Sequence, residues 1–288
     1  MKSGTVIFWF ASFFCLTVAG AFEATVGEYR QMSVEDLRTA FRADREAVRR
    51  VYDAANRAFE NKNYGEAVDL YQLLVTGEQA SDSLYLNLGT AHFRNGSPGV
   101  AALWFRRATH VKPGIPEVRQ NFEFLRRQQG FLEFGAAEWQ RFLLRLSPGL
   151  LSWAAWIPLW MTLFSLLFVI FGSRLTIKPL LIAAAFFAAT GSAAFFGLGW
   201  YRAKHLAPEN FATVVEKGTS ALTAPAPDSD PVVSLPEGSE IRVIQDTGPW
   251  IYASIPGDVV GWVHHSSIER NWPIPTERTN FMPLDTDL

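Results

Sequence analysis

The side chains that most often bind metals or attack substrates are scarce in this chain. Its 288 residues include five histidines and one cysteine, Cys15. No histidine pair has the spacing of a zinc-binding helix motif, and the adjacent His264 and His265 would point to opposite faces of a strand. The sequence also lacks the glycine motifs of phosphate and dinucleotide sites and the G-x-S-x-G turn of a nucleophilic serine. We therefore expect no catalytic, cofactor or metal site and no enzyme, although a pair of catalytic carboxylates is left open.

The longest apolar stretch of the chain divides into two segments, 150–172 and 180–201. Each holds about 20 residues without an ionisable side chain, which is the length a helix needs to cross a bilayer. The connector 173–179 is too short to hold a domain. We predict a transmembrane hairpin with both flanks on one side of the membrane; a hairpin buried in a globular core is the alternative.

Small residues recur at every fourth position of the second apolar segment. They are Ala185, Ala189, Ala193 and Gly197. A ridge of this kind lets another helix approach closely. It predicts packing against the first helix of the hairpin or against a membrane helix of a partner.

The N-terminal residues 1–21 are typical of a secretory signal peptide. Lys2 precedes an apolar core, and the small residues Ala19 and Ala21 fit the A-x-A cleavage pattern. Export of the chain predicts that both soluble parts lie outside the cytoplasm and that the loop 173–179 is cytoplasmic. Whether the segment is cleaved is left open; cleavage would remove Cys15.

A 34-residue period organises the region before the hairpin. The residues that would fill helix contacts recur at this distance, with Ala55, Ala58, Tyr64, Ala67, Tyr71 and Leu74 followed by Gly89, His92, Pro98, Ala101, Phe105 and Ala108. Two helices per 34 residues, with small residues at the crossings, resemble the tetratricopeptide repeat. We expect an all-α repeat domain at 22–130 with capping helices at 33–50 and 115–129; a generic pair of helical hairpins is the alternative.

The resemblance to tetratricopeptide repeats implies a concave groove formed by the first helix of each repeat. This peptide groove would be lined by Tyr52, Asn56, Phe59, Leu86, Thr90, Phe93 and Arg94. Such grooves bind extended or helical peptides. The carboxylate-clamp variant is not matched, because Leu86 and Thr90 stand where polar or basic residues would be needed. A purely structural role without a ligand is the alternative.

The segment 131–149 links the repeats to the first apolar helix. Trp139, Phe142, Leu143 and Leu146 fall at one face of a helix in this segment. The pattern predicts an amphipathic juxtamembrane helix in the membrane interface, or equally a core helix of the repeat domain.

Short alternating runs separated by Pro and Gly follow the hairpin. They predict five strands, at 211–215, 232–235, 241–245, 250–255 and 259–264. Five short strands in about 60 residues predict a small closed barrel at 207–271. The residues 272–288 are expected to form an extended tail.

The landmarks of this region are Leu235-Pro-Glu-Gly238, Gly248-Pro-Trp250 and Gly261-Trp262-Val263. Their order resembles the bacterial SH3-like domain. Trp250 and Trp262 either fill the barrel or form a ligand platform. We favour packing, because a small barrel needs large side chains to fill it. The Asn-x-Arg stretch usual in such domains is replaced by residues 220–223, which puts a transferred wall-binding role in doubt.

The order of these parts resembles the BatE proteins of bacterial aerotolerance operons. The resemblance implies a place in the bacterial inner membrane, with both soluble domains in the periplasm. It also implies a MoxR-type ATPase system and membrane-anchored von Willebrand A-domain proteins as partners. We expect a non-enzymatic adaptor or scaffold for other proteins; the alternative is a cell-envelope sensor that binds peptidoglycan. The net charge of −2 predicts no nucleic-acid partner.

Overall fold

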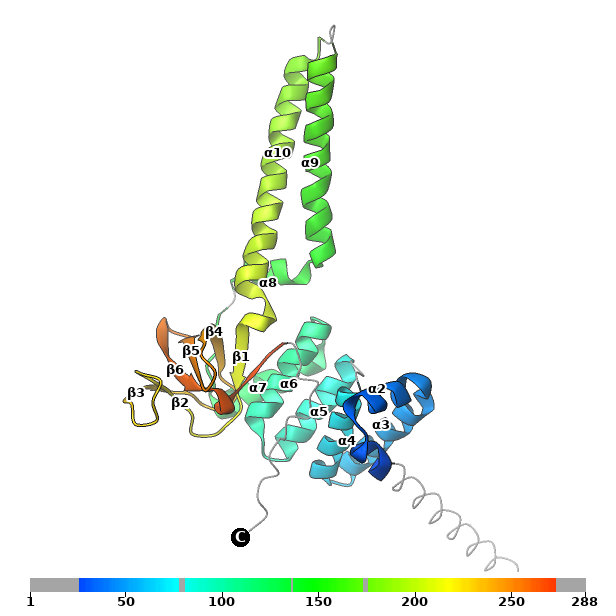
Figure 1. Cartoon of the computed structure of the whole chain (residues 1–288), viewed down its shortest axis with the longest axis vertical. Coiled ribbons are helices and arrows are strands. Elements are labelled where there is room, and N and C mark those ends of the chain that lie inside the picture. The colour runs from blue at the N-terminus through cyan, green and yellow to red at the C-terminus, as the bar shows by residue number, and fades with distance from the viewer. Residues whose placement is uncertain (1–25, 78–80, 136, 173–175, 273–288) are drawn as a thin grey trace, which may run out of the picture.

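The computed structural model describes residues 26–77, 81–135, 137–172 and 176–272. The expected signal peptide and nearly all of the expected tail lie outside these residues. Figure 1 shows a helical domain, a β-sheet beside it, and a pair of long helices that projects from both. The fold is therefore helix-rich, with a C-terminal antiparallel sheet and two long apolar helices.

The helical domain follows the 34-residue period of the sequence. After a helical segment at residues 26–31 it contains α2 (Val34–Ala43), α3 (Arg45–Glu60), α4 (Tyr64–Thr76), α5 (Asp82–Arg94), α6 (Pro98–Val111) and α7 (Pro116–Gln129). The ends of α3 and α5 are 34 residues apart, as are the starts of α4 and α6. A Cβ atom on Gly89 would come within 2.8 Å of the Phe105 ring, so glycine is needed where α5 crosses α6.

The first capping helix was predicted wrongly. The segment 33–50 does not form one helix, because the chain breaks at Asp44. The Asp44 carboxylate accepts hydrogen bonds from the backbone N–H groups of Glu46 (2.9 Å) and Ala47 (3.0 Å) and caps α3. Residues 45–50 therefore belong to the first helix of the first pair.

The C-terminal sheet has seven antiparallel strands rather than five. They are β1 (Phe211–Val214), β2 (Ser220–Leu222), β3 (Pro231–Ser234), β4 (Glu240–Asp246), β5 (Trp250–Ile255), β6 (Val259–His264) and β7 (Ile268–Arg270). Their order is β3-β2-β6-β5-β4-β1-β7, so the described strands do not close into a ring. The strands β2 and β7 were missed because three residues are too few to show an alternating pattern.

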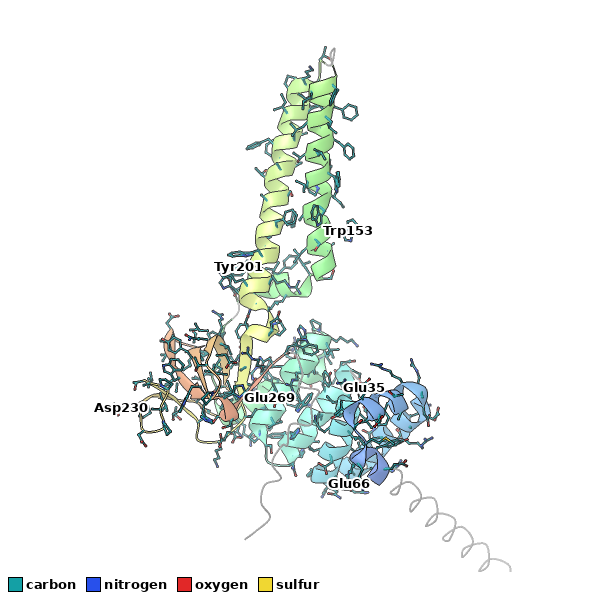
Figure 2. The ribbon with its side chains drawn as sticks, viewed as in Figure 1. Glu35, Glu66, Trp153, Tyr201, Asp230 and Glu269 are labelled. Atoms are coloured by element: carbon teal, nitrogen blue, oxygen red, sulfur yellow. The ribbon has the colours of Figure 1, made fainter. Side chains whose placement is uncertain are left out.

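Arg107 of α6 docks the helical domain on the sheet. Its side chain is 1% exposed and donates hydrogen bonds to the Glu269 carboxylate (2.7 Å) and to the backbone oxygens of Arg270 (3.0 Å) and Asn271 (3.3 Å). The guanidinium also lies 4.5 Å from the ring centre of Trp104. Figure 2 shows Glu269 at the boundary between the two parts.

Arg106 makes a second, independent set of contacts with the sheet. It donates to the Thr213 hydroxyl (2.9 Å) and lies 3.6 Å from the Glu240 carboxylate and 3.3 Å from that of Glu133. Burial raises the pKa of Glu240, and the nearby Arg106 opposes this rise. Because buried charges are costly unless paired, the two parts are held in one relative orientation.

The segment after α7 is attached to the sheet as well. The Leu132 N–H donates to the Ser239 hydroxyl (3.1 Å), and the Glu240 N–H donates to the Leu132 carbonyl (2.8 Å). Phe131 packs in the helical core, while Leu132 packs against the core of the sheet. The helical domain and the sheet therefore form one soluble body, which the sequence did not predict.

The two apolar helices pack against each other along their length. A short helix α8 (Glu138–Arg145) precedes α9 (Pro148–Phe171) and α10 (Lys178–Tyr201), and η1 (Arg202–Leu206) and η2 (Pro208–Asn210) lead into β1. Both long helices are apolar and long enough to cross a membrane, and the soluble body lies entirely at one end of the pair (Figure 1).

Hydroxyl groups join α9 to α10. Thr162 donates to the Ala185 carbonyl (3.3 Å), Ser165 to the Leu181 carbonyl (2.8 Å), and Ser192 to the Ala155 carbonyl (2.8 Å). Such bonds between helices are expected where lipid offers the hydroxyl no other partner.

The ridge of small residues does not form this contact as a whole. Ala185 is 5% exposed and lies between the helices, but Ala189, Ala193 and Gly197 are exposed. Each step of four residues rotates about 40° around a helix of 3.6 residues per turn, so the ridge leaves the contact face. The buried positions next to α9 are instead Ala185 and Ser192, which are seven residues apart.

The close approach of α6 to β1 gives a matched test of the docked arrangement. A Cβ atom on Gly99 would come 2.9 Å from the Val214 carbonyl oxygen and 3.0 Å from the Val215 backbone, whereas one on Gly65 would meet only a side-chain atom at 4.0 Å. Both glycines are the second residue of their helices, one repeat apart.

We expect Gly99→Ala to lower the free energy of unfolding by about 1–3 kcal/mol through overpacking. Gly65→Ala should be neutral or stabilise its helix by up to about 1 kcal/mol. Denaturant unfolding of the detergent-solubilised chain measures both. Equal effects of the two substitutions would contradict the docked arrangement.

Candidate functional site

The predicted groove residues lie on the exposed side of α3 and α5. A hollow of about 160 Å³ opens between these helices and is lined by Asn56, Phe59, Glu60, Tyr71, Asn87 and Thr90. Asn56, Phe59 and Thr90 were predicted from the sequence. The structure thus brings three of the seven predicted residues together around one hollow.

A hydrogen-bond network fixes the polar side chains of this hollow. The Tyr71 hydroxyl donates to Asn56 Oδ1 (2.6 Å), and Asn87 Nδ2 donates to the Tyr52 hydroxyl (2.9 Å) and to Asn56 Oδ1 (3.4 Å). Burial raises the pKa of Tyr71 to about 12, so its hydroxyl stays protonated and acts as the donor. We call these four residues the amide–phenol network.

The network determines which group of Asn56 can bind a ligand. Its side-chain oxygen already accepts two hydrogen bonds, whereas its NH₂ group has no acceptor among the described residues. An amide NH₂ in a hollow is suited to donate to a peptide carbonyl. The side chain is also held in position before any ligand arrives, which lowers the entropy lost on binding.

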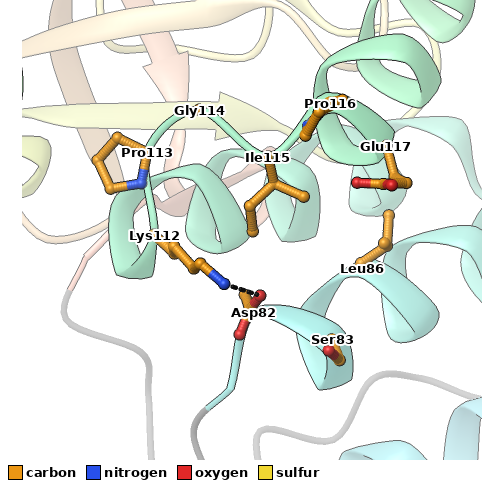
Figure 3. A pocket seen from close by; sticks show the side chains of 9 residues that line it. All are labelled: Asp82, Ser83, Leu86, Lys112, Pro113, Gly114, Ile115, Pro116 and Glu117. Atoms are coloured by element: carbon orange, nitrogen blue, oxygen red, sulfur yellow. Dashed lines mark hydrogen bonds and ion pairs between the residues drawn. The ribbon is translucent and has the colours of Figure 1, made fainter.

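A second hollow lies on the other side of α5. It has a volume of about 380 Å³ and is lined by Asp82, Ser83, Leu86, Lys112, Pro113, Gly114, Ile115, Pro116 and Glu117. Figure 3 shows Leu86 and Ile115 at its wall and the ion pair of Lys112 with Asp82, 3.3 Å apart. The predicted residue Leu86 therefore belongs to this hollow and not to the first.

The other predicted groove residues take separate places. Phe93 packs edge-on against Phe124 of α7, with ring centres 5.9 Å apart, and Arg94 is exposed in the last turn of α5. Phe124 is 56% exposed and therefore offers an apolar contact next to Phe93. We call the two hollows, together with the Phe93–Phe124 ring pair, the groove.

Sequence reasoning missed Asn87 and Phe124, and it assigned Tyr71 only to the contacts between repeat helices. Asn87 lies three residues before Thr90, and residues three apart share a face of a helix, so this spacing was an available signal. Phe124 is on α7, which was treated only as a cap.

The two tryptophans of the sheet are on its outer face, so the favoured core-filling interpretation is wrong. Along β5, Ile251, Ala253 and Ile255 are buried, and Trp250 and Tyr252 alternate with them on the opposite side. The core is filled by aliphatic side chains.

The outward-facing rings form pairs across β5 and β6. Trp250 lies 5.1 Å from His264 and Tyr252 lies 5.0 Å from Trp262, measured between ring centres. The four side chains are partly or fully exposed. We call Trp250, Tyr252, Trp262 and His264 the aromatic face.

No protein-family model matches the chain, and no curated protein and no solved structure is significantly similar to it. Among the described residues, no three His, Cys, Asp or Glu side chains lie close enough to hold a metal ion together. What the chain binds is therefore inferred from the groove, the aromatic face and the apolar helices.

The position of the aromatic face predicts that two substitutions in adjacent strands lower the free energy of unfolding by different amounts. Trp262→Ala should lower the free energy of unfolding by about 1–3 kcal/mol, because the ring is only partly buried and its pair with Tyr252 adds to the area that it buries. Ile251→Ala should cost about 2–5 kcal/mol, because Ile251 is 1% exposed. Thermal unfolding of the two variants measures the difference. A larger loss of stability for Trp262→Ala than for Ile251→Ala would indicate that the Trp262 ring belongs to the core.

Proposed function

We propose that the chain is a non-enzymatic membrane-anchored adaptor that binds an extended segment of a partner protein in the groove. The observation that supports this most directly is the amide–phenol network, which fixes Asn56 with its NH₂ group free to donate. The hollows on either side of α5 provide room for side chains of such a segment, and Phe93 and Phe124 provide apolar contact.

The chemistry of the groove favours binding over reaction. Its central side chains are amides and phenols, and burial raises the pKa of both Tyr52 and Tyr71. These groups keep their protons near neutral pH and exchange hydrogen bonds with a ligand, but they do not serve as bases. A peptide backbone, which offers alternating carbonyl and N–H groups, is a suitable ligand.

We also propose that the helical domain consists of tetratricopeptide repeats and that the sheet is an SH3-like domain. The 34-residue spacing of helix boundaries supports tetratricopeptide repeats, and the short antiparallel strands support an SH3-like domain. With a BatE-like arrangement, the chain would lie in the bacterial inner membrane with the soluble body in the periplasm. Its partners would include membrane-anchored von Willebrand A-domain proteins in an envelope stress complex.

The groove is tested by a double substitution with a matched control. Asn56→Ala combined with Phe93→Ala should abolish co-purification of partner proteins in mild detergent, because it removes the oriented NH₂ group and an apolar contact. Asn61→Ala combined with Asn95→Ala changes the exposed C-caps of α3 and α5, and this variant should still co-purify with the partner proteins. Mass spectrometry of the purified complexes makes the comparison; retention of every partner by the groove variant would refute the proposed site.

The aromatic face supports a second function, binding of peptidoglycan by the sheet. Partly exposed rings in a row can stack on the apolar faces of sugar rings, and tryptophans in the core could not do so. In this case the chain would be a cell-envelope sensor, and the groove would transmit the signal.

Sedimentation of the full chain with purified cell wall tests this second function. Wall binding through the aromatic face would be lost on Trp262→Ala but kept on Trp153→Ala, because Trp153 is an exposed tryptophan of α9, far from the sheet (Figure 2). If the unsubstituted chain stays in the supernatant, the adaptor function alone stands.

A further inference from the structure

The short helix α8 presents large apolar side chains that the described part of the chain covers only in part. Trp139 is 51% exposed, Phe142 is 61% exposed and Leu144 is 38% exposed, whereas Leu143 is 3% exposed. Such side chains on a soluble surface are costly unless another phase or molecule receives them.

The end of α10 holds α8 in a fixed position. Gln140 Nε2 donates to the Tyr201 hydroxyl (2.8 Å), and the rings of Trp139 and Tyr201 lie 5.2 Å apart. The Arg202 guanidinium donates to the backbone oxygens of Leu143 (3.3 Å) and Leu146, which are left without helical partners at the end of α8. Figure 1 shows α8 lying across the base of the helix pair.

These contacts determine the depth of α8 if the helix pair crosses a membrane. The helices α9 and α10 have 24 residues each, so each is about 36 Å long, about 6 Å more than a hydrocarbon core. If the hydrocarbon core of the membrane begins at the connector, about 20 residues of each helix lie within it. The hydrocarbon core then ends near Ser152 on α9 and near Leu198 on α10.

Tyr201 and Arg202 therefore lie about 5 Å beyond the hydrocarbon, within the headgroup layer. The exposed rings of Trp153 and Trp200 lie near the same boundary, where membrane proteins concentrate tryptophan. Because α8 contacts Tyr201 and Arg202, it lies at this depth too.

The charge of this region favours an anionic surface. The sequences of α8 and η1 contain four cationic residues, Arg141, Arg145, Arg202 and Lys204, and one acidic residue, Glu138. Lys204 is exposed, and its ammonium lies 4.8 Å from the ring centre of Trp200. A lysine beside an interfacial tryptophan is well placed to reach a lipid phosphate.

Resting on the membrane location proposed above, we infer that α8 and η1 form a docking surface for anionic phospholipid headgroups. The apolar edge of α8, formed by Trp139 and Phe142, inserts into the interfacial layer, and Lys204 contacts phosphate. The occupant is lipid because α8 continues the exposed apolar surface of α9 and α10 at the depth where an interfacial helix is embedded. The surface sets the height and tilt of the groove above the membrane.

Three matched labelling sites test this inference in the full chain. The only cysteine is changed by Cys15→Ser, and a polarity-sensitive fluorophore is attached through Phe142→Cys on α8, Met161→Cys near the middle of α9 or Phe124→Cys on α7. The three side chains are similarly exposed, at 61%, 61% and 56%. The chain is reconstituted in vesicles of phosphatidylcholine alone or with phosphatidylglycerol, and nitroxide lipids quench the label from shallow or deep positions.

We expect the label at 142 to be quenched several-fold more by shallow than by deep nitroxides, the label at 161 to show the reverse, and the label at 124 to escape both. Phosphatidylglycerol should strengthen the quenching at 142, and Lys204→Gln should remove that gain. Deep quenching at 161 with no quenching at 142 overturns the inference while leaving the membrane location intact. A blue-shifted but unquenched label at 142 would show that protein and not lipid covers this site, and an unquenched label at 161 would refute the membrane location itself. Equal quenching at 142 in both lipids would refute the anionic preference.

Discussion

Two adjacent arginines of α6 hold the soluble body together. Neighbouring residues of a helix point about 100° apart, so Arg106 reaches β1 and β4 while Arg107 reaches β7 and the backbone after it. Contacts in two directions determine an orientation, which a single ion pair would not. The carboxylates of Glu240 and Glu269 would be buried without a cation if the sheet stayed in place and the arginines were lost, and such unpaired charges are costly.

This docking determines how the hairpin, which lies between two parts of the soluble body in the sequence, is attached to that body. The chain leaves the body just after Phe134 and returns to it at Phe211, and these two rings lie 5.8 Å apart with Arg242 within 5.2 Å of both. The two ends of the hairpin are therefore attached to one place on one rigid object. Movement of the hairpin would move the groove and the aromatic face together, and not one against the other.

The parts of the structure that could be predicted from the sequence depend on local pattern. Run length alone indicated α9 and α10, and the 34-residue period indicated the paired helices. The docked body was not predictable, because Arg106 and Arg107 find partners more than 100 residues away along the chain. The face of the sheet on which Trp250 lies was predicted wrongly for another reason. The strand Trp250–Ile255 is apolar on both of its faces, so its alternation does not say which face is buried.

The hydrogen bonds of the first hollow could not be predicted from the sequence. Asn56 and Thr90 were named in advance and both line this hollow, whereas the hydrogen bond of Asn87 to Tyr52 joins side chains 35 residues apart on α5 and α3. A hydrogen bond between side chains of different helices depends on tertiary distance, which a periodic pattern does not contain.

Rigidity also changes how two binding surfaces on this body would act together. Two modules on a flexible tether raise each other's effective concentration for many partners of different shape. The groove and the aromatic face lie instead at a fixed separation, because α6 is docked on the sheet. A partner that bound both surfaces would need segments that span that separation, so the proposed adaptor would select partners by their geometry as well as by the affinity of either contact.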